Sequence, residues 1–423
     1  ALIETSLLNK NNDKTNFPEK KIKSLCPFCG VGCQTLVSVK DNKIIAVDGQ
    51  NGPANENRLC VKGRFGFDYI NSPLRLTTPL IRISKKSKSW DISIDDKDIY
   101  KYFRKASWEE ALDLASNNFT EILKSNKINS LAGFGSAKGS NEEAYIFQKL
   151  IRTGFKTNNV DHCTRLCHAS SVAALLQSVG SAAVSAPFTA VKDSECIILI
   201  GARPEQNHPV AASYFKQAVK NGTKLIILDP RKQSLSRYAT HHLQFNPGQD
   251  LSLLNAMIFT IINENLTNKE YIGNYTEGFE QLEKEIKKFN PALMEKICGI
   301  RKEIIREVAR IYAKAKTSII FWGMGISQHV HGTQNAFSLI NLALITGHLG
   351  KPGTGLHPLR GQNNVQGASD AGLIPMSYPD YNSVKIKTNN KKMQKFWNSN
   401  LDLNEGKTVV EIIKGINSGE IKG

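Results

Sequence analysis

The chain has 423 residues, which is longer than a single compact core normally allows, so two or three domains are expected. Apolar residues make up 40% of the sequence and charged residues 22%, an ordinary composition for a soluble protein. Lys and Arg number 55 against 38 Asp and Glu, and the net charge of +17 favours an anionic partner or cofactor. The lysine-rich stretches lie among Asn, Ser and Asp without interleaved aromatic residues, so nucleic-acid binding is not expected.

The sequence contains no apolar run close to the roughly 20 residues that a membrane-spanning helix requires. Residues 1–20 are rich in Asn and Lys, have no apolar signal core and predict a mobile tail. A cytoplasmic protein without a membrane span is therefore expected. In that compartment, eight cysteines favour metal ligands, catalytic groups or core residues over disulfides.

The first predicted element in the chain is a β-hairpin. Apolar and polar side chains alternate over Gln34–Lys40 and again over Lys43–Asp48. Asp41 and Asn42, between the two runs, are residues typical of a tight turn. A small β module is therefore expected at the start of the fold.

Helices alternate with strands after this module. A helix is predicted from Trp108 to about Leu123, with Ser107 as its N-cap and Glu110 at the capping-box position. A short strand at Leu131–Phe134 and a helix at Asn141–Arg152 follow.

A βαβ unit is predicted further along the chain. Two short runs rich in β-branched residues, Cys196–Ile200 and Leu225–Leu228, flank a helical segment at Ala211–Lys220 and imply a parallel sheet. The class is therefore α/β. The segment His357–Gly372 is too rich in Gly and Asn for a regular element, so we expect an irregular, functional segment there. The other predicted elements are helices at Asp250–Asn263, Lys302–Ala315 and Asn335–Thr346, and a strand at Ser318–Trp322.

Four cysteines form the most informative motif. Cys26, Cys29 and Cys33 follow one another with two and three intervening residues, and Cys60 follows across the hairpin. This spacing suits a 4Fe-4S cluster with four cysteine ligands. Structural zinc is one alternative, although zinc sites prefer two Cys-x2-Cys pairs, and core cysteines are another. Lys62 is placed to bridge the cluster and an anionic cofactor, unless it is simply a surface lysine.

The cysteine motif and the sequence Leu59–Arg64 resemble those of the molybdopterin oxidoreductases that bind a bis-molybdopterin guanine dinucleotide, and in particular formate dehydrogenase catalytic subunits. The resemblance extends from about Ser24 over nearly the whole chain. It implies a small β-rich 4Fe-4S module followed by two parallel-sheet, Rossmann-like α/β domains, the second inserted in the first. The expected boundaries are 1–85 for the module, 86–160 plus 363–423 for the incomplete α/β domain, and 161–362 for the dinucleotide-binding domain. The family's C-terminal β-barrel-like domain is expected to be absent.

The resemblance also assigns roles within the motif Asp161–His168. Cys167 stands where these enzymes have the cysteine or selenocysteine that ligates Mo or W, and His168 where they have the histidine that assists proton movement. A soft thiolate suits such a metal, and an imidazole titrates near neutral pH. Outside this context, a core thiol beside a satisfied histidine would be the simpler interpretation. Cys163 is not expected to be a ligand, because the family uses one, and two further cysteines are expected in the core, Cys196 and Cys298.

A third motif, Leu359–Ala368, contains Arg360. A guanidinium binds a planar carboxylate through two parallel hydrogen bonds, and the resemblance makes Arg360 the group that binds formate. The alternative is an arginine paired with a structural acid in a loop. Gln362, in the same motif, is expected to contact the cofactor.

Four loops are expected to bind the dinucleotide. Two of them follow predicted parallel strands, at Gly201–His208 and Leu228–Arg231, and the carboxyl ends of such strands are where nucleotide cofactors bind. The other two loops are Phe245–Asp250 and Trp322–Gln328. The candidate contacts in these loops are Gly201, Glu205, Asp229, Arg231, Gly248, Asp250, Gly323, Met324, Gly325 and Gln328.

The resemblance implies the reversible two-electron oxidation of formate to CO2 at a Mo or W bis-molybdopterin guanine dinucleotide centre, with electrons leaving past Lys62 to the 4Fe-4S cluster. Because the sequence shows no NAD or flavin site, a redox partner subunit is expected, either ferredoxin-like, flavin- or NAD-binding, or a hydrogenase subunit. A separate chain that supplies the C-terminal part is one expectation, and a truncated product is the other. A nitrate reductase of the same family and a non-catalytic iron-sulfur scaffold remain alternative functions.

Overall fold

The computed structural model describes residues 18–83, 99–125 and 129–423, so almost all of the predicted tail lies outside the described residues. The first described elements are three antiparallel strands in the order β1-β2-β3. Asp41 and Asn42, between β2 and β3, have φ values of 50° and 55°, as a two-residue hairpin turn requires. The predicted hairpin is therefore confirmed. The three strands are β1 (Lys20–Leu25), β2 (Gln34–Lys40) and β3 (Lys43–Gly49).

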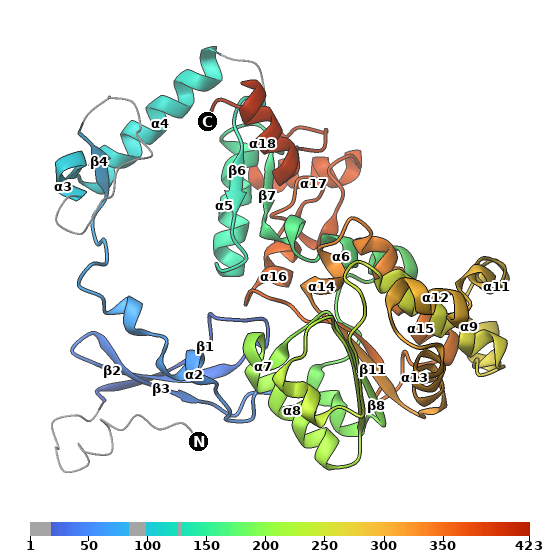
Figure 1. Ribbon diagram of the computed structural model, residues 1–423. Helices are drawn as coiled ribbons and strands as arrows, with labels where there is room; N and C mark the ends of the chain where they lie inside the picture. Colours follow the sequence, from blue (N-terminus) through green and yellow to red (C-terminus); the bar gives the residue numbers. More distant parts are fainter. Residues whose placement is uncertain (1–17, 84–98, 126–128) are drawn as a thin grey trace, which may run out of the picture.

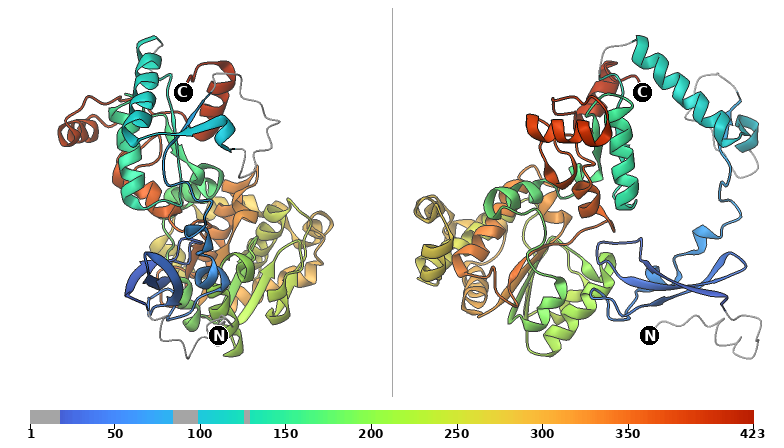
Figure 2. Two further views of the ribbon diagram at one scale, coloured as in Figure 1. Left: turned by 90° about the vertical axis from the view of Figure 1, so that its left-hand side faces the viewer. Right: turned by 180° about the vertical axis from the view of Figure 1, so that it is seen from behind.

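The long helix α4 (Trp108–Ser125) begins where the sequence predicted. Ser107 Oγ accepts a hydrogen bond from the Glu110 amide at 3.1 Å, whereas the Glu110 carboxylate pairs with Arg104 and not with the helix end. The N-terminal end of the helix stands away from the rest of the chain (Figures 1 and 2), and Trp108 is 68% exposed. Nearer its C-terminal end, the helix packs against the loop that follows α5 (Asn141–Thr153), with 4.8 Å between the ring centroids of Phe119 and Phe155. The elements between β3 and α4 are α2 (Val61–Phe65), η2 (Asp68–Ile70), β4 (Leu80–Arg82), α3 (Ile99–Tyr102) and β5 (Phe103–Lys105).

A five-stranded parallel sheet forms the centre of the largest domain, with the order β10-β9-β8-β11-β12. Each residue of β8 and β11 is fully buried, because both strands have neighbours on two sides and helices over both faces. The predicted βαβ unit and the predicted strand at Ser318–Trp322 are confirmed. The strands are β8 (Cys196–Ile200), β9 (Lys224–Leu228), β10 (His241–Leu243), β11 (Ser318–Trp322) and β12 (Gly355–Pro358).

Alternate side chains of the sheet pack into two different cores. Ile198 and Ile200 face a core with α9, α13 and α15. Ile197 and Leu199 face a second core, which includes α8 and the loop that carries Cys26, Cys29 and Cys33, named the cysteine loop from here on. The predicted helices are found within a few residues of their predicted ends. No helix in the described part of the chain is long and apolar enough to cross a membrane. The helices around the sheet are α6 (Ala169–Val179), α7 (Pro204–Asn207), α8 (Pro209–Lys220), α9 (Asp250–Asn263), α10 (Lys269–Tyr275), α11 (Phe279–Ile286), α12 (Pro291–Cys298), α13 (Lys302–Lys314), α14 (Met324–Ser327) and α15 (Gly332–Thr346), with the 3-10 turns η4 (Phe188–Asp193), η5 (Ser234–Tyr238) and η6 (Lys287–Phe289).

A second, smaller α/β unit combines two distant parts of the chain. Strands β6 and β7 form a two-stranded parallel sheet, and α5 packs against residues of the last part of the chain, such as Ala368 and Leu373. We name these parts, residues 129–162 and 363–423, the β6–β7 unit. The domain boundaries given above remain a prediction. The elements of the unit are β6 (Gly133–Gly135), α5 (Asn141–Thr153), β7 (Val160–His162), α16 (Val365–Asp370), η7 (Pro379–Tyr381), α17 (Lys387–Trp397) and α18 (Val409–Ser418).

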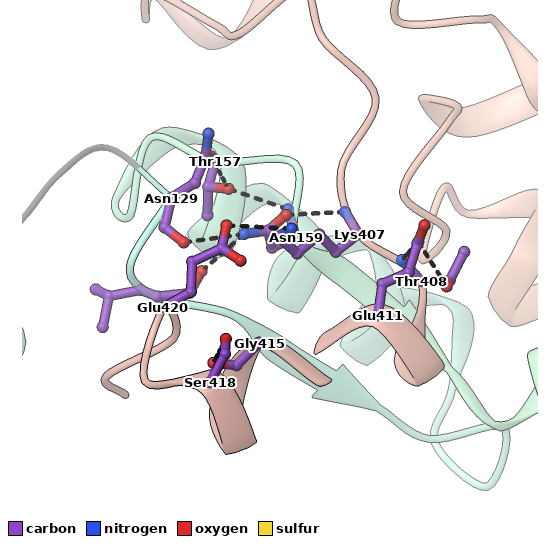
Figure 3. A network of polar contacts seen from close by, with 10 residues as sticks. Asn129, Thr157, Asn159, Lys407, Thr408, Glu411, Gly415, Ser418 and Glu420 are labelled. Carbon is purple, nitrogen blue, oxygen red and sulfur yellow. Dashed lines mark hydrogen bonds and ion pairs between the residues drawn. The ribbon is translucent and has the colours of Figure 1, made fainter. Parts of the chain in front are cut away.

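Polar contacts join the two parts of this unit, as Figure 3 shows. The Asn159 side chain accepts a hydrogen bond from the Lys407 amide at 2.8 Å and donates one to the Asn129 carbonyl at 3.2 Å. Within the second part, Lys407 Nζ also forms an ion pair of 3.1 Å with Glu420. The β6–β7 unit is therefore held together across a sequence separation of 248 residues.

One sequence expectation is wrong. Residues 357–372 were expected to contain no regular element, but Val365–Asp370 form the helix α16, and β12 ends at Pro358. Gly367 lies inside the helix, and a Cβ there would clash with side-chain oxygens of Asn141 and Asn364. Close packing therefore explains this glycine, and the irregular parts of the segment are the residues between β12 and α16 and the turn that follows α16.

Candidate active site

A cavity of about 520 Å³ opens at the carboxyl edge of the five-stranded sheet. The cavity lies beside the neighbouring strands β8 and β11. From β8 the chain continues to β9 and β10 at one edge of the sheet, and from β11 it continues to β12 at the other. Open α/β sheets bind ligands where the strand order reverses in this way. Most of the residues predicted to contact the dinucleotide line the cavity, and Lys62 reaches it from the cysteine module. These lining residues are Lys62, Gly201, Asp229, Arg231, Gly248, Asp250, Gly323, Met324 and Gly325.

Three of the predicted contacts do not line this cavity. Glu205 accepts hydrogen bonds from the Ser234 hydroxyl and the Leu235 amide. Gln328 donates a hydrogen bond of 2.5 Å to the Leu166 carbonyl. Gln362 lies beside the Cys167 sulfur, with 3.9 Å between its Oε1 and Sγ. The first two therefore hold loops in place, and the third belongs to the surroundings of Cys167.

Four polar residues of the cavity were not among the predicted contacts: Arg203, Asn207, His208 and His329. Arg203 Nε and His208 Nδ1 are buried atoms without a hydrogen-bond partner among the described residues. Buried polar groups normally have partners, so these atoms point to a bound ligand. Arg203 and His208 lie in the predicted loop Gly201–His208, where a cation was a detectable signal, but nothing in the sequence distinguished His329.

Two aspartates give the cavity its acidic groups. Asp229 Oδ1 accepts a hydrogen bond from the Arg231 amide at 2.8 Å, and Asp250 lies 3.8 Å from His329 Nε2. Burial raises the pKa of each carboxyl group above its ordinary value. Neighbouring cations, such as Arg203 beside Asp229 and His329 beside Asp250, only partly oppose this effect. Both groups can accept hydrogen bonds from a nucleotide inside an otherwise basic cavity.

Gly201 permits the loops after β8 and β11 to touch. Its φ is +56°, and a Cβ at this position would lie 2.9 Å from the backbone of Gly325. Gly325 in turn leaves no room for a side chain, since a Cβ there would lie 2.6 Å from the Gly201 Cα. The two glycines therefore shape the cavity wall by close backbone packing.

The four motif cysteines lie together on the small β module. The Cys26 amide donates to the Cys33 carbonyl at 2.9 Å, which closes the loop, and Cys60 precedes α2. Burial and then the neighbouring thiols raise the pKa of Cys33 to about 12, and burial also raises the pKa values of Cys26 and Cys29. Coordinated metal removes the protons of such thiols outright. Lys62 lies between Cys29 and the cavity wall, with Nζ 3.4 Å from the Gln206 carbonyl.

Cys167 lies where β7 and its following turn η3 (Cys163–Leu166) meet the loops of the sheet. Its Sγ is 3.4 Å from Met324 Sδ, and Met324 lines the cavity. Burial raises the pKa of the thiol, Cys163 raises it further, and Arg360 opposes both effects. The structure therefore brings Cys167, Gln362 and Arg360 to one place. Cys196 and Cys298 are buried in the core, as expected.

His168 is fully buried and both of its ring nitrogens are engaged. Nε2 lies 2.9 Å from the Leu359 carbonyl, so Nε2 carries the proton and donates it, whereas Nδ1 accepts from the Ser327 hydroxyl at 3.0 Å. Burial and the nearby Arg360 lower the pKa of the ring to about 3. In this arrangement His168 is neutral and holds the residue that precedes Arg360.

Arg360 is 9% exposed, and its Nη2 donates to the Ala182 carbonyl at 2.7 Å and to Gln366 Oε1 at 2.8 Å. No carboxylate of the described residues lies within ion-pair distance of it, so the alternative of a structural acid partner is not supported within residues 18–83, 99–125 and 129–423. Arg360 also lines a second cavity, of about 350 Å³. It is a buried cation available to an anion.

Residues 19–72 match the model of the molybdopterin oxidoreductase Fe4S4 domain, and residues 75–422 match that of the molybdopterin oxidoreductases. The chain belongs to the molybdopterin oxidoreductase family. It is 40% identical over 93% of its length to the F420-dependent formate dehydrogenase subunit alpha of Methanocaldococcus jannaschii, and 37% identical over 95% to formate dehydrogenase H of Escherichia coli. Both matches cover 55% of the relative, so the chain spans about half the length of the curated relatives it matches.

A solved structure supports the fold. Acetylene hydratase from Pelobacter acetylenicus superposes with a TM-score of 0.68 at 24% identity, over 78% of this chain and 43% of the other. At this identity the likeness concerns the architecture alone. The likeness supports the α/β architecture of the chain, and the two family models identify it as a molybdopterin oxidoreductase with an N-terminal iron-sulfur domain.

Family membership implies a 4Fe-4S cluster and a Mo or W bis-molybdopterin guanine dinucleotide, and the residues fit both. Four buried or half-buried thiols share one module, and three of them have raised pKa values. The match of residues 19–72 to the Fe4S4 domain model favours the cluster over structural zinc as the group that these four thiols bind. The cavity beside the cluster supplies cations, two carboxylates and unpartnered buried atoms for a phosphate-rich, nucleotide-containing cofactor.

Proposed function

We propose that this molybdopterin oxidoreductase oxidises formate to CO2 reversibly, with release of two electrons and one proton. The observation that carries the proposal is Arg360, a buried guanidinium without a carboxylate partner among the described residues, close enough to Cys167 that each charge affects the other's pKa. The named relatives at 36–40% identity that are formate dehydrogenases support the same reaction. No observation favours nitrate in particular.

In this proposal, Arg360 binds the carboxylate of formate. One of its two terminal nitrogens is occupied by Ala182 and Gln366, which fixes the direction of the guanidinium and reduces its rotational freedom. Cys167 would ligate the metal, and Gln362 would lie beside that sulfur. The bound metal and pterins would supply the two-electron redox chemistry, which no side chain of the protein supplies by itself.

For His168 we propose a role in proton transfer that requires a rearrangement. Nε2 already carries the proton that it donates to the Leu359 carbonyl, so the ring can accept a further proton only at Nδ1, after the hydrogen bond from the Ser327 hydroxyl breaks. Until then the ring holds the backbone next to Arg360. The histidine thus acts first by positioning and then by chemistry.

Electrons would leave past Lys62 to the cluster, since Lys62 lines the cavity and its charge acts on Cys29. We propose a redox partner subunit as their acceptor, and a further polypeptide region equivalent to the rest of the relatives, on which activity would depend. We also propose a cytoplasmic location, in line with the eight free cysteines.

The proposal is tested with the native complex, purified without oxygen and checked for iron, Mo and W by elemental mass spectrometry. Formate should reduce a viologen dye, and Arg360→Gln should lower kcat/KM for formate by about a hundredfold or more. Arg310→Gln is the matched control, because Arg310 is an exposed arginine on α13 that forms an ion pair with Glu264. Oxidation of reduced dye by nitrate, without any reduction by formate, would overturn the proposal in favour of a nitrate reductase.

A further inference from the structure

Lys138 connects the β6–β7 unit to the cysteine loop. It lies between β6 and α5, and its Nζ donates hydrogen bonds to the Pro27 carbonyl at 3.1 Å and to the Phe28 carbonyl at 2.9 Å. Pro27 and Phe28 are the two residues between Cys26 and Cys29. A cation that is 111 residues away in sequence is therefore bound to the tightest turn of the cluster-binding loop.

The peptide groups that Lys138 contacts also face the cysteine sulfurs. The Phe28 amide is a hydrogen-bond donor to the Cys26 thiol, and the carbonyl of that same peptide belongs to Pro27. A cation bound to the carbonyl oxygen polarises the peptide and strengthens its N–H as a donor. The charge of Lys138 also acts directly on Cys26 and Cys29. Both effects stabilise negative charge on the sulfurs.

The backbone of Lys138 is held in a defined place. The Asn363 side chain donates to the Lys138 carbonyl at 3.3 Å, and the Asn364 side chain donates to the Gly139 carbonyl at 2.9 Å. Ser140, two residues later, forms a complete capping box with Glu143 at the start of α5. Lys138 is solvent-exposed, but its side chain extends toward the cysteine loop from a fixed backbone and is held there by two hydrogen bonds.

Lys62 and Lys138 approach the cysteine loop differently. Lys62 lines the 520 Å³ cavity, whereas Lys138 does not, and only Lys138 hydrogen-bonds to the residues between Cys26 and Cys29. We propose that Lys138 is a positioning residue that raises the reduction potential of the 4Fe-4S cluster. Positive charge and hydrogen bonds near the sulfurs favour the reduced cluster, which carries one more negative charge. The inference rests on the cluster and is independent of the substrate.

The test is a redox titration of the cluster in the holoenzyme, followed by electron paramagnetic resonance of the reduced state. Lys138→Gln removes the charge but keeps an N–H donor, and it should lower the reduced-to-oxidised ratio about tenfold at a given potential, or shift the midpoint about 59 mV more negative. Lys138→Arg keeps the charge and should restore the wild-type midpoint. Lys220→Gln is the control, because Lys220 is an exposed lysine at the end of α8 and its loss changes the net charge equally.

A second variant changes its charge with pH, so the effect of that charge on the cluster midpoint is measured within one folded protein. Lys138→His places a titratable group at the same position, so the midpoint should rise further than in the wild type as pH falls through the ordinary imidazole pKa of about 6.5. This measurement also serves if the Gln variant assembles no cluster. The proposal is overturned if the Gln and His variants keep the wild-type midpoint and pH dependence while only their thermal stability falls. Lys138 would then join the modules without affecting the cluster.

Discussion

The five-stranded sheet and the β6–β7 unit are built from the same kind of parallel strand and helix, but they bury their strands to different extents. Every residue of β8 and β11 is fully buried. In the β6–β7 unit only β7 is buried throughout; Phe134 in β6 is 49% exposed, and α5 leaves Ile146 64% exposed. Apolar packing therefore stabilises the large sheet, whereas two strands cannot build a comparable core and depend more on polar contacts. Arg152 is the clearest of these contacts.

The largest expected effect follows from replacing Arg152, which would sharpen the comparison. This buried side chain donates to Gln148, to Asn158 and to the three carbonyls of residues 372, 374 and 377. Arg152→Met leaves these acceptors unsatisfied and should lower the free energy of unfolding of the β6–β7 unit by about 4 kcal/mol. Hydrogen-exchange mass spectrometry should show faster exchange in that unit, with the large sheet unchanged.

Arg310→Met serves as the control for this experiment. Arg310 forms an exposed ion pair with Glu264, so its loss should cost less than about 1 kcal/mol. Equal exchange in both regions of the Arg152 variant would mean that the β6–β7 unit does not unfold separately, and the comparison would fail.

A smaller effect is expected from a cavity in the large sheet. Ile198 on β8 is fully buried, and Ile198→Ala should lower the free energy of unfolding by about 3 kcal/mol in urea denaturation. Ile146→Ala on α5 removes the same atoms from an exposed position and should change stability by less than about 0.5 kcal/mol. Similar losses for the two variants would show that α5 is covered in solution.

The smallest effect is a dependence on pH that both regions should share. Burial lowers the pKa of His348, beside the large sheet, and of His162 in β7 to about 4. The unfolded chain therefore binds more protons between about pH 4 and 6.5, so this contribution to stability is complete above about pH 6.5 and decreases as the pH falls to 4. Urea denaturation at several pH values should show this decrease, and His348→Gln should reduce its slope. A slope unchanged in the variant would assign the effect to other groups.

Regular elements were largely predictable because their signals are local. The apolar runs at Cys196–Ile200 and Ser318–Trp322 became the two central strands, and the pair Asp41-Asn42 formed the predicted turn. The helix α16 was missed, because Gly367 and the two asparagines before the helix, Asn363 and Asn364, are typical of loops. The close approach of the Asn141 side chain, which leaves no room for a Cβ at Gly367, comes from a distant part of the chain. Local propensity does not contain that information.

The candidate site was predictable in its chemistry but not in its contacts. Cysteine spacing indicated the cluster, which family membership supports, and the motifs around Cys167 and Arg360 indicated residues that do lie together. The two hydrogen bonds of the His168 ring and the position of His329 in the cavity could not be predicted from the sequence, whereas Arg203 lies in a predicted loop and was a signal that could have been used.

The sequence by itself determined the class of fold and the family, and it predicted four cysteines as cluster ligands, because periodicity, turn residues and cysteine spacing are local features. The tertiary structure decided which distant groups meet: Lys138 at the cysteine loop, Arg152 at the carbonyls after α16, and His168 at the Leu359 carbonyl. These contacts join residues more than 100 positions apart, and they depend on the way the strands and helices pack. No local pattern encodes that packing, since each contact forms only when two complete elements are in place.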